Sequence, residues 1–88
     1  MNDLHSLRKK IDDIDGRIVK LLLERFIVVN DIAEYKKEHG LEVLQKSREA
    51  EVLKNIADKI DTAEYREYIL KIYAEILETS KLSQNKKP

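Results

Sequence analysis

The sequence contains no cysteine and no tryptophan, only one proline and only two glycines. The missing cysteines exclude a disulfide framework and a cysteine-ligated zinc site, and the scarcity of glycine and proline leaves few turn signals for β-hairpins. The two histidines, His5 and His39, have no metal-ligand partner at a suitable spacing. We therefore expect neither a metal nor another cofactor.

An excess of charge of one sign is also missing, because 17 basic residues balance 17 acidic ones. No overall field recruits nucleic acid or an anionic membrane. The first residues, MNDLHSLRKK, contain no apolar signal core, and no apolar run approaches the ~20 residues of a membrane span. We expect a cytoplasmic protein that binds neither nucleic acid nor membrane.

What is present is a short chain of 88 residues, 42% apolar and 39% charged. This composition is typical of a helix-rich protein, and the length fits a single domain over residues 1–88. A chain of this size buries only roughly 60–65% of its unfolded surface, so a lone monomer would be marginally stable.

A long first helix is predicted from about residue 3 to residue 38. Apolar residues recur at alternating spacings of three and four, which is the pattern of a helical seam. The seam consists of Leu4, Leu7, Ile11, Ile14, Ile18, Leu21, Val28, Ile32 and Tyr35, with position 25 as its one interruption. Leu22, Val29 and Ala33 widen it into a face that can meet more than one partner helix.

Two shorter helices follow. The second starts near residues 45–47 and runs for about fifteen residues, and the third starts after the turn at 61–64 and ends around 82–84, before a disordered tail at about 85–88. The first helix would span roughly 50 Å, far more than a compact monomer of this size needs, so its overhanging half would expose the seam. Pairing with a second copy removes that exposed surface. The expected fold is all-α, with three helices per chain in an intertwined homodimeric bundle.

Polar residues interrupt the apolar stripes at several points. In the run LLLERFIVV, Arg25 occupies a seam position, and Lys36 lies on the same face about three turns later. Arg8 is too far away on the same helix to reach them, but an antiparallel partner helix could bring it there. On the third helix the apolar stripe continues into Ser80 and Gln84.

Each of these residues alone has an ordinary structural explanation. Arg25 could pair with an acid or set dimer register, and Lys36 and Arg8 could be solvated. Ser80 and Gln84 could belong to a fraying helix end. Arg48 and Glu49 stand in the first turn of the second helix, where Glu49 could merely complement the helix dipole. Together, three cations, one carboxylate and two neutral hydrogen-bonding groups favour a pocket for a small dianion with a hydroxyl, without an activated nucleophile or a metal cage.

Five segments in order carry a family resemblance: LRKKIDDID with Arg8, LLLER with Arg25, EYKKE with Lys36, SREAEVL with Arg48 and Glu49, and ILETSKLSQ with Ser80 and Gln84. They resemble the all-helical, type II class of chorismate mutases, in monofunctional form, and the match covers nearly the whole chain. Members of this class are intertwined homodimers whose active sites draw on both chains.

The resemblance implies a role for each matching residue. Arg25 and Arg8, the latter from the partner subunit, would bind the two carboxylates of chorismate, helped by Ser80 and Lys36. Lys36 and Gln84 would donate to the ether oxygen of the breaking bond. Glu49 would accept from the ring hydroxyl, and Arg48 matches a partly structural position.

One position departs from the family pattern, since Gln45 stands where an aspartate is common. Part of that position's contribution comes from its backbone amide, which glutamine also supplies. The implied reaction is the Claisen rearrangement of chorismate to prephenate, a step toward phenylalanine and tyrosine. Two alternatives remain open at this point: an isochorismate-pyruvate lyase of the same fold, and a non-catalytic helical dimerisation module in which Arg25 only sets register.

Overall fold

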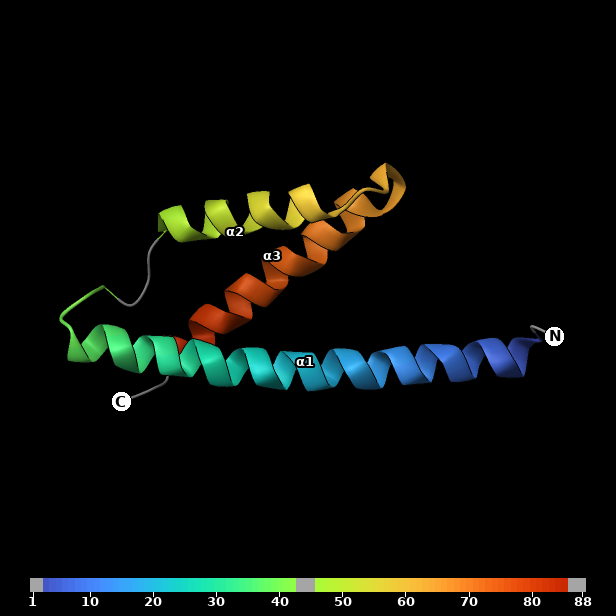
Figure 1. Cartoon of the computed structure of the whole chain (residues 1–88), viewed down its shortest axis with the longest axis horizontal. Helices are drawn as coiled ribbons and strands as arrows, with labels where there is room; N and C mark the ends of the chain where they lie inside the picture. Colours follow the sequence, from blue (N-terminus) through green and yellow to red (C-terminus); the bar gives the residue numbers. More distant parts are fainter. Residues whose placement is uncertain (1–2, 43–45, 86–88) are drawn as a thin grey trace.

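The computed structural model of the chain describes residues 3–42 and 46–85, and all three predicted helices are present (Figure 1). They are α1 at Leu4–Glu38, α2 at Lys46–Lys59 and α3 at Ala63–Asn85. The described residues contain no strand. The all-α prediction is therefore confirmed, with α3 extending one residue beyond its expected end.

Both ends of α1 are closed by local hydrogen bonds. At the start, the Asp3 carboxylate accepts from the backbone N–H of Ser6 at 2.8 Å, which satisfies one of the amides that a helix start leaves unpaired. At the end, Gly40 has a φ of +68°. The Leu41 N–H donates to the Lys36 carbonyl at 2.8 Å and the Gly40 N–H to the Lys37 carbonyl at 3.3 Å. This is the Schellman arrangement, for which a glycine is favoured because it has no Cβ to clash at positive φ.

The three helices form an open angle rather than a closed bundle (Figure 1). α2 and α3 form an antiparallel pair, and the C-terminal half of α3 packs on the C-terminal half of α1. Within the described ranges α1 and α2 do not approach each other closely. The N-terminal half of α1 extends past the other helices, and the molecule measures 57 × 26 × 16 Å.

The core is small and lies where α3 meets α1. Ala33 of α1 and Leu77 of α3 are buried, and so is the hydroxyl-bearing Ser80. α3 packs on the side of α1 that carries Leu22, Phe26 and Ala33, so this widened face does meet a partner helix.

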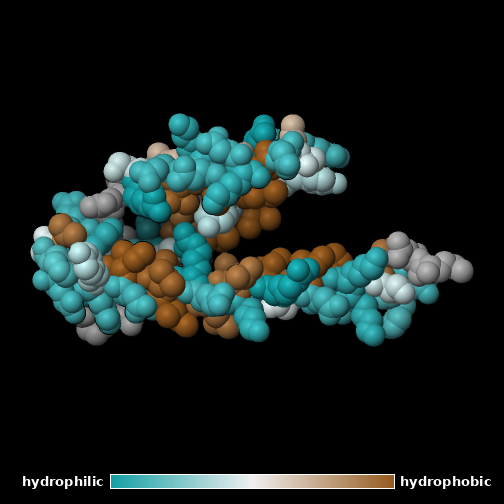
Figure 2. Space-filling model, viewed as in Figure 1, coloured by the Kyte–Doolittle hydropathy of each residue, from teal (hydrophilic) through white to brown (hydrophobic). Residues whose placement is uncertain are grey.

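The seam itself stays exposed in the single chain. The exposed fraction is 62% for Leu4, 55% for Ile11 and still 54% for Val28, deep in the paired half of the helix. Figure 2 shows hydrophobic surface along the sides of α1 and α3 that face the open angle. A groove of about 480 Å³ lies there, lined by Leu22, Phe26, Ile72, Glu75, Ile76 and Thr79. In the part of the chain that the structure describes, no helix combines the length and the apolar composition needed to cross a membrane.

Candidate active site

Arg25 meets Ser80 where α1 and α3 cross. The Arg25 Nη1 donates to the Ser80 Oγ at 2.7 Å, and the Ser80 Oγ donates in turn to the Ile76 carbonyl at 2.8 Å. A hydroxyl has only one hydrogen, so in this state Ser80 acts as an acceptor for Arg25. Ser80 is only 7% exposed. The contact fixes one edge of the guanidinium, and the group has further N–H donors for a bound anion.

Tyr73 of α3 supports the same guanidinium from another side. The Arg25 Cζ lies 5.6 Å from the centroid of the Tyr73 ring, a cation–π distance. A charged group on an apolar seam is thus held by one hydroxyl and one aromatic ring. Sequence spacing alone gave no sign of this contact.

Gln84 lies one helical turn beyond Ser80 and faces α1. Its Nε2 donates to the Val29 carbonyl at 3.4 Å, near the long limit for a hydrogen bond. The neighbouring Ser83 Oγ donates to the Asn30 Oδ1 at 3.3 Å. A long hydrogen bond can be exchanged for a better acceptor, so the Gln84 amide can be redirected to a ligand.

Lys36 is half-buried on α1, eleven residues after Arg25. Eleven residues of helix rise about 16 Å, and both side chains lie on the same side of the helix. Long cationic side chains at this separation can converge on a ligand between them. The structure therefore brings Arg25, Ser80 and Gln84 to the crossing of α1 and α3, and Lys36 lies about 16 Å further along the same side of α1.

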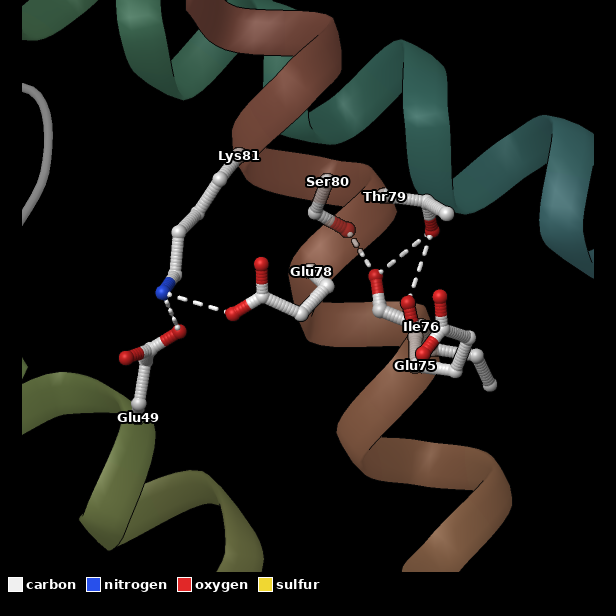
Figure 3. Close-up of polar contacts among 7 residues, drawn as sticks. All are labelled: Glu49, Glu75, Ile76, Glu78, Thr79, Ser80 and Lys81. Atoms are coloured by element: carbon white, nitrogen blue, oxygen red, sulfur yellow. Dashed lines mark hydrogen bonds and ion pairs between the residues drawn. The ribbon is translucent and has the colours of Figure 1, made fainter.

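The first turn of α2 contributes Glu49, which is bound by a residue that the sequence analysis missed. The Lys81 Nζ lies 2.7 Å from the Glu49 Oε1 and 3.0 Å from the Glu78 Oε1 (Figure 3). The Glu49 carboxylate, followed by that of Glu78, raises the pKa of the Lys81 ammonium. Glu78 and Lys81 have the i, i+3 spacing of a surface ion pair on one helix, which gives no hint of the longer link to α2.

Two other expected residues, Arg48 and Arg8, lie apart from this region. Arg48 is exposed and pairs with Glu51 of its own helix. Gln45 lies outside the described residues. Arg8 is exposed on α1, seventeen residues before Arg25, which corresponds to about 25 Å along the helix axis. A single chain therefore does not bring Arg8 to the other cations.

The assembled groups can bind an anion and hydrogen-bond to it, and they suit chemistry without a covalent intermediate. Among the described residues, no group of three or more histidine, cysteine, aspartate and glutamate side chains could hold a metal ion. Arg25, Lys36 and Gln84 carry N–H donors, and Glu49 carries a carboxylate that can accept. Such a set can orient a small anionic substrate and stabilise charge that develops within it.

Comparison with known proteins agrees with this chemistry. The family model described as chorismate mutase type II matches residues 7–85. A chorismate mutase of Methanocaldococcus jannaschii is 34% identical over 82 residues, which are 92% of this chain and 83% of that protein. A bifunctional chorismate mutase/prephenate dehydratase of Buchnera aphidicola is 36% identical over 88 residues, and one of Aquifex aeolicus is 35% identical over 82 residues. The matches cover 97% and 88% of this chain but only 22% of each bifunctional protein.

Proposed function

The chain belongs to the chorismate mutase type II family, and from this premise we propose how its residues convert chorismate to prephenate. The enzyme is an isomerase, and its product links it to aromatic amino-acid biosynthesis. The observation that carries the assignment of residues is the Arg25–Ser80 hydrogen bond of 2.7 Å, which holds a cation at the α1–α3 crossing with Gln84 one turn away.

The rearrangement is intramolecular and needs no proton transfer, so the protein has to hold the enolpyruvyl side chain over the ring. Arg25 binds one substrate carboxylate, and Arg8 of the partner subunit binds the other. Ser80 and Lys36 assist. Two clamps at a fixed separation hold the flexible side chain in its reactive pose. The conformational entropy of the substrate is therefore lost on binding rather than in the chemical step.

Negative charge grows on the ether oxygen because the carbon–oxygen bond breaks ahead of carbon–carbon bond formation. Lys36 and Gln84 donate to that oxygen. A donor aimed at developing charge in a site that excludes water is typically worth about 3 kcal/mol of transition-state stabilisation. The weak contact between the Gln84 Nε2 and the Val29 carbonyl is given up when the substrate enters.

The ring hydroxyl donates to Glu49. Arg48 keeps a supporting role in the first turn of α2, where it pairs with Glu51. The backbone amide of Gln45 contributes to binding of the same part of the substrate. The assignments of Glu49 and Arg48 follow the family pattern, whereas Gln45 stands where an aspartate is common and is assigned only through its backbone amide.

A second copy of the chain completes the site. Two apolar surfaces are exposed to water in the single chain. One is the seam of the N-terminal half of α1, and the other is the groove between α1 and α3. In an antiparallel dimer, the seam of one subunit covers the groove of the other. The same pairing carries Arg8 across the interface.

Cytoplasmic residence stays a prediction.

The test incubates the purified protein with chorismate and follows the product by proton NMR. Prephenate is expected. Release of pyruvate from isochorismate, without prephenate from chorismate, would instead assign the lyase activity. The variant Ile11→Glu places a charge on the exposed seam and is expected to elute as a monomer and to lose activity. A fully active monomer would refute the shared site.

A further inference from the structure

Lys81 stands in sequence between two residues of the proposed site, Ser80 and Gln84, but it points to another neighbour. Figure 3 shows its side chain leaving α3 toward the first turn of α2, where the ammonium meets Glu49. The Ser80 hydroxyl is directed to the other side, toward the Ile76 carbonyl. Two neighbouring residues of α3 therefore contact the other two helices, Ser80 through Arg25 of α1 and Lys81 through Glu49 of α2.

We propose that Lys81 is a positioning residue that holds the Glu49 carboxylate in place for the substrate hydroxyl. The proposal rests on the function proposed above. α2 packs on α3 and not on α1 within the described residues, so Glu49 is placed relative to Arg25 only through α3. The 2.7 Å contact with Lys81 is the polar link that ties the carboxylate itself to α3.

An ammonium suits this task because it has three hydrogens to donate. Two are directed to the Oε1 atoms of Glu49 and Glu78, at 2.7 Å and 3.0 Å. Glu78 lies three residues before Lys81 on the same helix, and its side chain is 61% exposed, so this contact is an ordinary surface ion pair. A carboxylate has two oxygens, and the contact with Lys81 engages Oε1, so Glu49 keeps acceptor capacity for a hydroxyl.

The positive charge also separates two carboxylates that would otherwise repel each other. Glu49 and Glu78 bind the same ammonium, and both raise its pKa, which keeps Lys81 charged across the neutral range. Without the Lys81 charge, repulsion between the two carboxylates would favour a rotamer that turns Glu49 away from Glu78 toward water. Loss of Lys81 would then leave the hydroxyl-binding group present but misplaced.

A purely structural ion pair between Lys81 and Glu49 predicts no change in KM for chorismate when it is removed. The side chains of Lys81 and Glu49 are 33% and 31% exposed, and exposed ion pairs contribute little to the free energy of unfolding. The positioning role therefore predicts a change in substrate binding with little change in thermal stability.

The experiment measures kcat and KM for chorismate in a small set of full-length variants. Lys81→Met removes the charge at similar length and is expected to raise KM about tenfold while kcat changes less than about threefold, because the lost interaction is made equally in ground and transition states. Lys81→Arg retains the charge and should restore KM to within about threefold of the wild type. Glu78→Gln is the matched control, since it removes the other carboxylate, and should leave KM within about twofold.

A double variant separates positioning from an independent effect. If Lys81 acts through Glu49, Lys81→Met adds little to the defect of Glu49→Gln, whereas independent effects multiply. An unchanged KM in Lys81→Met, or full multiplication with Glu49→Gln, overturns the proposal.

A second measurement distinguishes this failure from failure of the mutase assignment. Amide hydrogen exchange at the N–H groups of α2 that donate to the carbonyls of its first turn should become faster in Lys81→Met and stay unchanged in Glu78→Gln. Absence of prephenate formation by the wild type would refute the proposed function, while the exchange comparison would still decide whether Lys81 anchors Glu49. If Lys81→Met is active and shows faster exchange but an unchanged KM, Lys81 only stabilises the structure of α2, and the positioning role is refuted.

Discussion

Replacing Arg25 with leucine should separate activity from stability. On the folding side, the change removes the hydrogen bond to the Ser80 Oγ, of a charge-assisted kind worth about 1.5–3 kcal/mol, and the contact with Tyr73, worth about 0.5–1 kcal/mol. It also relieves the cost of half-burying a charge and adds a leucine to an apolar seam; full burial of a leucine, which the proposed dimer would provide, is worth about 1.5–3 kcal/mol. The opposing contributions are of similar size. The free energy of unfolding should therefore change by no more than about 1 kcal/mol.

On the catalytic side nothing offsets the loss. An arginine that clamps a carboxylate with two charge-assisted hydrogen bonds contributes at least about 3 kcal/mol. Each 1.4 kcal/mol is about tenfold, so kcat/KM should fall at least about 100-fold. The fall is measured by following chorismate consumption, alongside thermal melting by circular dichroism and size-exclusion chromatography.

Two further variants make the result specific. Lys20→Leu removes an exposed cation from the same helix and should keep kcat/KM within about twofold. Arg25→Lys keeps the charge but loses the planar fork, so its activity should lie between those of Arg25→Leu and the wild type. A folded Arg25→Leu dimer with near-normal turnover would refute the assignment of Arg25 to substrate binding and would favour a role in dimer register.

Three other predictions follow from the structure. Gln84→Glu should lower kcat about 100-fold at neutral pH and regain activity as the pH falls, because a glutamate donates only when protonated; a pH-independent defect would contradict the donor role. Gly16→Ala should raise the free energy of unfolding by about 0.5–1 kcal/mol in a denaturant titration, because a Cβ at this helical position meets no atom within 4 Å; a loss of stability would place an unseen contact there. The Ser6 N–H lowers the pKa of the Asp3 carboxyl, so the stabilisation by this cap is complete above the unfolded pKa and is lost as the pH falls through the lower folded pKa. Between about pH 5 and pH 2 the melting temperature of the wild type should therefore fall by a few degrees more than that of Asp3→Asn. An equal fall in both proteins would contradict a contribution from the Asp3 charge.

Helix type and extent were predictable because they depend on local pattern. The alternating spacing of three and four predicted α1 from residue 3 to 38, and the helix runs from Leu4 to Glu38. Lysines in a last turn followed by a glycine are typical of a helix end, and Gly40 has the positive φ that such a position favours. The widened face at Leu22 and Ala33 meets one helix, α3, within the described residues, and its contact with a further helix stays a prediction.

The site was only partly predictable because its contacts join distant segments. Arg25 and Ser80 interrupt apolar stripes, and this interruption is visible in sequence; that they hydrogen-bond across 55 positions is not. Tyr73 fits the periodicity of a core residue, so its ring contact with Arg25 had no separate signal. Lys81 resembles an ordinary solvated lysine until α2 brings Glu49 to it. Periodicity describes one helix at a time, whereas these contacts depend on how two helices cross.

The uncovered N-terminal half of α1 has a consequence for how much enzyme a cell obtains. Under the proposed pairing, a lone chain leaves Leu4 and Ile11 in water, so folding and association become one bimolecular equilibrium. Each tenfold dilution then lowers the stability of the folded dimer by about 1.4 kcal/mol, and the melting temperature falls with protein concentration. At low expression the amount of active site grows with the square of the chain concentration. Gene dosage would in that regime control flux more steeply than for a monomeric enzyme.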